Sequence, residues 1–171
     1  MRKEITKSRS MELASTLYKR PWAEAWVKGS PKYPTIEGRV LFYQTLYGVL
    51  VEAEIFGLPE EGDKCPKSIF AFHIHEGGSC DPGSKNDFPE TGGHYNPNDC
   101  EHPYHAGDMP PLFGNAGYAF MTFLTNRFSV KEVIGKTVII HAGKDDFTTQ
   151  PSGNAGEKMA CGEIKSHLRK Y

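Results

Sequence analysis

The chain has 171 residues, of which 38% are hydrophobic and 24% are charged, and its formal net charge is −1. The length favours one domain, and the composition is typical of a folded globular protein. The near-neutral charge argues against a broad basic surface for nucleic acid, and no apolar run reaches the ~18 residues of a membrane-spanning helix. We therefore expect no nucleic-acid partner and no membrane partner.

The N-terminal segment MRKEITKSRSMELASTLYKR contains six lysines and arginines against two glutamates, and it lacks the apolar core of a secretory signal. We interpret residues 1–21 as a basic, solvated extension, with a weak membrane or partner contact as the alternative, and residues 22–171 as the folded domain. The missing signal pattern favours a cytoplasmic location.

Seven segments are rich in β-branched, apolar and aromatic residues and have the length of strands. They are 23–29, 36–44, 48–58, 68–76, 117–125, 136–143 and 158–165. Eighteen glycines and twelve prolines supply turns between them, and we find no repeat and no long helical period. Seven or eight short strands with long connections predict an all-β antiparallel sandwich or barrel.

The fourth segment contains FAFHIHEGG, in which His73 and His75 are one residue apart. Side chains two positions apart in a strand point to the same face, with Cα atoms about 6.5–7 Å apart. Both imidazoles can then reach one metal ion. The alternative is a sheet face on which two histidines meet water.

A long polar stretch follows between residues 77 and 116, and a loop of this length in a small domain is usually functional. Six of the seven histidines fall between residues 73 and 141, which favours a metal site over scattered surface histidines; the seventh, His167, is interpreted as a solvated residue. The stretch carries three histidines and an aspartate, a ligand set that suits zinc: His94, His102, His105 and Asp108. His141 follows the apolar run TVII and can join His73 and His75 in an all-imidazole site, which suits copper.

Five motifs occur in one order along the chain: FHIHE, GGHYNP, HAGD, VIIHAGKDD and GNAGEKMACG. With these motifs, residues 22–165 resemble the copper/zinc superoxide dismutase family. The resemblance implies an eight-stranded antiparallel Greek-key barrel or sandwich, similar to an immunoglobulin fold, with long metal-binding and electrostatic loops. It also implies two metal cofactors, copper and zinc.

The resemblance further implies which residues hold the metals. Copper would be held by His73, His75, His94 and His141, and zinc by His94, His102, His105 and Asp108. His94 would bridge the two ions. Asp145 matches the family carboxylate that links a copper histidine to a zinc histidine, here His73 and His102.

Four cysteines allow three full pairings. Cys80 and Cys161 match the disulfide of the family. Cys65 and Cys100 depart from its pattern, and they form either a second bridge or two free thiols. Disulfides favour an oxidising compartment, so an extracytoplasmic location is the alternative to the cytoplasm. The sequence does not specify the oligomeric state, and a homodimer is one option.

The implied reaction is dismutation of two superoxide anions to dioxygen and hydrogen peroxide, in which His94 releases the copper and carries a proton. The family usually has arginine where this chain has Lys158, and lysine keeps the charge but loses the planar pair of donors. We expect Lys158 to attract the anion and to orient it less well. The alternative function is a non-catalytic copper- and zinc-binding protein for metal storage or delivery.

Overall fold

The first three strands form an antiparallel meander whose alternate side chains share one core. They are β1 (Ala23–Gly29), β2 (Glu37–Thr45) and β3 (Gly48–Phe56). Ala25 lies opposite Val40, Val40 lies opposite Ala53, and all three side chains are fully buried. The computed structural model describes residues 9–62, 64–85 and 87–167.

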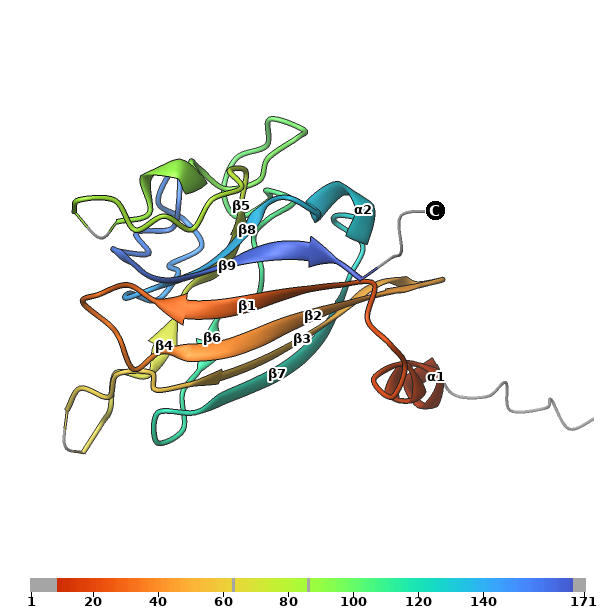
Figure 1. Ribbon diagram of the computed structural model, residues 1–171, viewed down its shortest axis with the longest axis horizontal. Helices are drawn as coiled ribbons and strands as arrows, with labels where there is room; N and C mark the ends of the chain where they lie inside the picture. Colours follow the sequence, from red (N-terminus) through yellow and green to blue (C-terminus); the bar gives the residue numbers. More distant parts are fainter. Residues whose placement is uncertain (1–8, 63, 86, 168–171) are drawn as a thin grey trace, which may run out of the picture.

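The meander is part of a seven-stranded sheet in the order β5-β8-β9-β1-β2-β3-β7, whose neighbours pair antiparallel (Figure 1). Its other strands are β5 (Phe72–His75), β7 (Ala119–Thr125), β8 (Thr137–His141) and β9 (Lys158–Ser166). The chain passes from β3 to one edge at β5, returns to β7 at the other edge, and crosses again to β8. These crossovers make the predicted Greek-key arrangement.

A two-stranded ladder of β4 (Ile69–Phe70) and β6 (Leu112–Phe113) connects the two edges of the curled sheet. β4 continues into β5 through Ala71, while β6 lies against β7. The single strand expected over 68–76 is thus two strands. The Ala71 N–H donates to the Gly143 carbonyl, and the Ala71 carbonyl accepts from the His141 N–H. The backbone of Ala71 therefore bonds to the end of β8 and the residues after it.

Three short helices lie outside the sheet among the described residues: α1 (Arg9–Thr16), η1 (Pro89–Thr91) and α2 (Val130–Val133). α1 occupies part of the segment expected to be solvated. Leu13 and Leu17 pack against an apolar cluster on the outer face of β2 and β3, formed by Leu41, Tyr43 and Leu50. That cluster gives the helix a surface to cover. The division of the chain at residue 21 stays a prediction.

Two long connections flank the β5–β8 side of the sheet, one of about 35 residues after β5 and one after β8 (Figure 1). Backbone hydrogen bonds tie the first to β5, where the Tyr95 N–H donates to the Ile74 carbonyl, and the second to the residue before β5, where the Ala71 N–H donates to the Gly143 carbonyl. They enclose the face of β5 that points away from the core.

Candidate metal centre

β5 places two imidazoles on the sheet face opposite the core. Phe72 and Ile74 belong to the main core, whereas His73 and His75 alternate with them and are buried on the other face. His141 ends the neighbouring strand β8, where the β8–β9 ladder shifts register after Ile140. The histidines of two adjacent strands therefore meet.

The long loop after β5 brings further ligand residues to this face through isolated backbone bridges. His94 pairs with His75, and Asp108 pairs with His73. These two bridges place His94 and Asp108, which are 14 residues apart in the loop, beside the same short strand. All the predicted ligand residues are buried.

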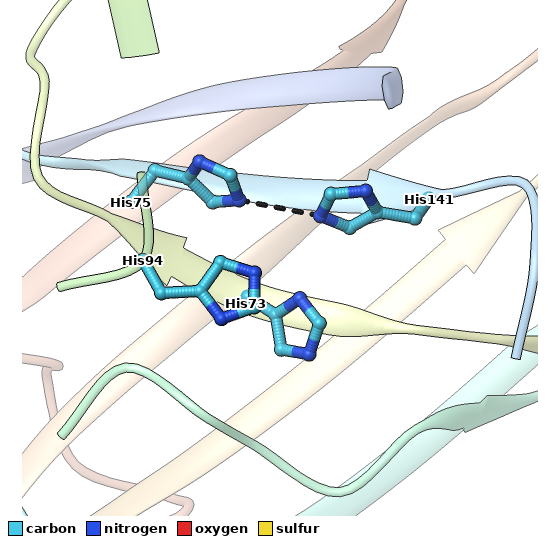
Figure 2. Close-up of side chains that lie close together, drawn as sticks. All are labelled: His73, His75, His94 and His141. Carbon is cyan, nitrogen blue, oxygen red and sulfur yellow. Dashed lines mark hydrogen bonds between the residues drawn. The ribbon is translucent and has the colours of Figure 1, made fainter. Parts of the chain in front are cut away.

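His75 and His141 point one nitrogen each at a common space. His75 Nδ1 donates to the Gly92 carbonyl at 2.9 Å, and His141 Nδ1 donates to the Gly156 carbonyl at 3.2 Å. A neutral imidazole has one N–H, so both Nε2 atoms then carry lone pairs. These atoms are 3.2 Å apart (Figure 2). Two facing lone pairs repel unless a cation lies between them.

Burial keeps both rings neutral. It lowers the pKa of His141 to about 3 and holds the pKa of His75 well below its usual range. The charge of His141 lowers the pKa of His75 further, and the charge of His73 lowers that of His141. Their Nε2 lone pairs are therefore available to a metal at neutral pH.

His73 and His94 complete this first group (Figure 2). His73 Nε2 donates to Asp145 at 2.8 Å, which leaves its Nδ1 buried without a hydrogen-bond partner. His94 Nε2 is also buried without a partner. The four histidines offer donor atoms that lie within 4.8 Å of one another. The group suits copper, which accepts imidazole ligands.

The second group consists of three imidazoles around one carboxylate. The Nδ1 atoms of His94, His102 and His105 lie 2.8, 3.1 and 3.3 Å from carboxylate oxygens of Asp108. His102 Nδ1 forms no hydrogen bond despite this proximity. Three histidines and one aspartate form the closed set that tetrahedral zinc prefers. Although burial raises the pKa of Asp108, the His94 hydrogen bond and the histidine charges lower it overall, so its carboxylate is ionised.

His94 belongs to both groups. Its Nδ1 lies 2.8 Å from Asp108 Oδ1, and its Nε2 is buried without a partner, so the ring has one nitrogen available to each group.

Asp145, in the loop after β8, links a histidine of the first group to a histidine of the second. One carboxylate oxygen accepts from His73 Nε2 and the other from His102 Nε2, both at 2.8 Å. Burial alone would raise the pKa of Asp145, but these bonds and the Phe147 N–H lower it to about 2. The fixed anion orients both rings so that their Nδ1 atoms point to the metal positions.

A cavity of about 410 Å³ opens onto the first group and is lined by His75, His141 and Lys158. The ammonium of Lys158 donates to Thr91 Oγ1 at 2.8 Å and to the carbonyls of Phe88 and Gly92 at 3.3 Å each. Three acceptors match the three N–H bonds of an ammonium, so Lys158 contributes a fixed positive charge rather than a free donor. Burial lowers the pKa of Lys158, and the charge of Asp87 partly restores it.

The charge of Glu157, adjacent to Lys158, is compensated by residues in the turn between β1 and β2. Lys32 donates to its carboxylate at 2.6 Å, and the Tyr33 hydroxyl also donates to it. These bonds lower the pKa of Glu157 and offset its charge beside the cavity.

Two residues that the sequence analysis missed hold the ligand loop. Arg127 Nη1 donates to the carbonyls of Pro103, His105 and Asp108 at 2.9–3.3 Å. Gln150 accepts from the His102 N–H at 2.9 Å and donates to the His102 carbonyl at 2.7 Å. Neither residue is part of a recognisable local pattern, because each acts on the loop backbone from a distant segment.

The cysteines follow one of the two alternatives. Cys80 and Cys161 form a disulfide, whereas Cys65 and Cys100 are exposed free thiols, so the second bridge is absent. The disulfide attaches the start of the connection between β5 and β6, here called the ligand loop, to β9.

Comparison with known proteins identifies the family. The family model for copper/zinc superoxide dismutase matches residues 36–164. The chain belongs to the copper/zinc superoxide dismutase family. It is 37% identical over 143 residues to superoxide dismutase [Cu-Zn] 1 of Aquifex aeolicus, covering 75% of this chain and 79% of that protein. With the Legionella pneumophila superoxide dismutase [Cu-Zn] it shares 34% over 140 residues, covering 77% and 80%.

Solved structures agree with this assignment. The Cu/Zn superoxide dismutase from Brucella abortus superposes with a TM-score of 0.70 at 26% identity, covering 84% of this chain and 99% of that one. A SOD-like protein from Bacillus subtilis gives 0.66 at 27% identity, covering 82% and 96%. The protein is thus a copper/zinc superoxide dismutase, an oxidoreductase with copper and zinc as cofactors. Within its described residues, no helix is long and apolar enough to cross a membrane.

Proposed function

We propose that copper binds to His73, His75, His94 and His141, that zinc binds to His94, His102, His105 and Asp108, and that superoxide reacts at the copper position. The observation that carries the proposal is the double placement of His94, whose two nitrogens face two different groups of ligands. When bound, copper supplies one-electron redox chemistry and zinc supplies a fixed positive charge.

The residues of the chain perform the remaining tasks. Two superoxide anions and two protons become dioxygen and hydrogen peroxide, so the site must attract anions and deliver protons. Lys158 provides positive charge at the wall of the cavity that leads to the copper ligands. His94 Nε2, buried and without a hydrogen-bond partner, is the atom that can hold a proton for the product.

Asp145 and the carbonyls of Gly92 and Gly156 keep the ligand rings in the tautomers that this assignment needs. Each accepts the N–H of a ligand ring and so directs the opposite nitrogen to a metal. The proposed centre is therefore preorganised by the loops around it.

Metal analysis of single variants tests the assignment. We expect His75→Ala to lose copper and keep zinc, His105→Ala to lose zinc, and His94→Ala to lower both, with superoxide turnover measured by pulse radiolysis. His167→Ala is the matched control, because this histidine contacts Glu24 outside the centre. Full copper and zinc in His94→Ala would refute the shared ligand. Two bound metals without turnover in the wild type would instead favour metal storage or delivery.

The cellular compartment and the oligomeric state are proposed from the sequence. A cytoplasmic location is tested by cell fractionation, with the Cys80–Cys161 disulfide favouring the extracytoplasmic alternative. A homodimer is tested by sedimentation. The absence of nucleic-acid and membrane partners is likewise a prediction, tested by binding assays with DNA and lipid vesicles.

A further inference from the structure

A second cavity, of about 350 Å³, lies on the outer face of β1 and β9, and the disulfide forms part of its wall. Trp26, Lys28, Cys80, Cys161 and Lys165 line it together with parts of the ligand loop. None of these residues belongs to the metal centre. The cavity therefore serves neither metal binding nor the reaction at the copper position.

The two sulfur-bearing residues differ in access. Cys161 is 2% exposed, whereas Cys80 is partly exposed at the start of the ligand loop. Thiol–disulfide exchange requires a thiolate to reach one sulfur in line with the bond that breaks. Because Cys80 is the more exposed of the two cysteines that line the cavity, we expect attack at Cys80 Sγ, with Cys161 as the leaving group.

Lys28 lies directly opposite Cys161 in the β1–β9 ladder, so both side chains are on the outer face. The side chain of Lys28 is exposed, and its ammonium makes no hydrogen bond or ion pair with the described residues. Glu163, the acid in the cavity wall, already pairs with Lys165 at 3.1 Å and accepts from the Cys80 N–H at 3.3 Å. The uncompensated charge in the cavity is thus that of Lys28.

We infer that this cavity is a thiol-exchange site for small anionic thiols. The anionic group of the thiol pairs with Lys28 while its thiolate attacks Cys80 Sγ. The Cys80–Cys161 bond breaks, a mixed disulfide forms at Cys80, and Cys161 leaves as a thiolate beside Lys28. A second thiolate attacks the outer sulfur of the mixed disulfide, releases a small-molecule disulfide and leaves Cys80 as a thiolate. One disulfide is reduced and two thiols are oxidised.

The exchange affects the metal centre through the ligand loop. Phe88 packs against Ile139 and the two cysteines, and its carbonyl accepts from Lys158. Breaking the disulfide releases the start of the segment that holds Lys158. Reversible thiolation would then lower superoxide turnover without touching a metal ligand.

Exchange kinetics test the site on the intact, metal-loaded protein. The probes are 3-mercaptopropionate (anionic), 2-mercaptoethanol (neutral) and cysteamine (cationic), compared at equal thiolate concentration, and acid quenching with peptide mass spectrometry gives rate and position. We expect 3-mercaptopropionate to react about fivefold faster than 2-mercaptoethanol and cysteamine to be the slowest. Addition to Cys80 supports the site. Addition to Cys161, or equal rates for the three probes, would overturn it.

Lys28→Glu should abolish the preference for the anionic thiol. Lys131→Glu makes the same charge change on α2 outside the cavity and should keep the preference. Equal effects of the two variants would refute a local role for Lys28. Salt gives a test without any variant, because the preference in the wild type should shrink between about 20 mM and 500 mM sodium chloride. A preference that is independent of salt would also contradict the proposal.

Discussion

At the scale of single residues, the chain differs from the usual family pattern at Lys158, the group that we propose attracts the substrate. Lys158 replaces the arginine of the family, and three loop acceptors occupy its ammonium. Its charge remains directed at the cavity, but a planar pair of donors for the anion is absent. In the proposed role, Lys158 therefore attracts the anion without orienting it.

Reversing the charge at Lys158 should lower kcat/KM at low salt by at least about tenfold, because steering raises the association rate of an anion by that order. We expect Lys158→Glu to lose most of the salt dependence of the rate and Lys158→Arg to retain it. Pulse radiolysis at several ionic strengths measures both. An unchanged rate for Lys158→Glu would show that this charge plays no part.

The support of the proposed ligands depends on a glycine in the loop after β8. Gly153 has a φ of +68°, and a Cβ there would lie 2.0 Å from Asp145 Oδ1 and 2.6 Å from His102 Nε2. We expect Gly153→Ala to displace Asp145 and to weaken zinc binding by about 10–100-fold, measured by competition with a chelator.

Gly135→Ala is the control for that substitution. Gly135 has a φ of +85°, and an added Cβ would meet nothing within 4 Å. The Gly135→Ala variant has the backbone strain of alanine at positive φ, about 1–2 kcal/mol, without a clash of the added Cβ. Equal zinc affinity in the two variants would show that strain alone, and not Asp145, explains the loss.

At the scale of elements, the strands were predictable because each has a local signal. β1, β2 and β3 contain β-branched and aromatic residues, and the structure confirms them within a residue or two at most ends. The division of 68–76 into β4 and β5 was not predictable. It depends on Ala71 bonding to segments about 70 residues away in the chain.

α1 was missed for a related reason. Its eight residues are too few for a clear helical period, and isolated helices of this length are unstable. Leu13 in the helix and Leu17 just after it pack on the Leu41–Tyr43–Leu50 cluster, which the pairing of β2 with β3 brings together. The helix is therefore a consequence of the sheet.

Replacing both Leu13 and Leu17 with serine should lower the free energy of unfolding by about 1–3 kcal/mol, because each substitution removes a partly buried apolar contact. Copper and zinc content should not change, since α1 does not contact the centre. Urea unfolding and metal analysis measure the two effects. Met11→Ser, at a 64% exposed position of the same helix, should leave stability unchanged; an equal loss there would contradict packing as the cause.

At the scale of the whole molecule, the buried histidines tie the stability of the metal-free protein to pH. Burial lowers the pKa of His75 and sets that of His141 at about 3, whereas an unfolded histidine titrates near 6.5. Between these values the unfolded chain binds more protons than the folded one, so stability falls as pH falls. The lowered pKa values of Asp108 and Asp145 act in the same direction below about pH 4.

The metal-free protein should therefore lose stability from about pH 6.5 downwards. Between pH 7 and pH 5 the free energy of unfolding should fall by about 2 kcal/mol for each strongly buried histidine. Denaturant unfolding at a series of pH values measures the slope. A flat profile over this range would show that these rings are not held neutral by the fold.

The sequence by itself determined the fold class and the β5 histidine pair, and its resemblance to a family supplied the ligand set that we propose for the metal centre. These features are predictable because strand alternation is local and because the histidine motifs are short, contiguous stretches of sequence. Only the tertiary structure decided which nitrogen of each ring is free, which distant side chains hold the loop, and that Lys28 faces the disulfide. Those relations depend on backbone pairing between segments far apart in the chain, which no local pattern encodes.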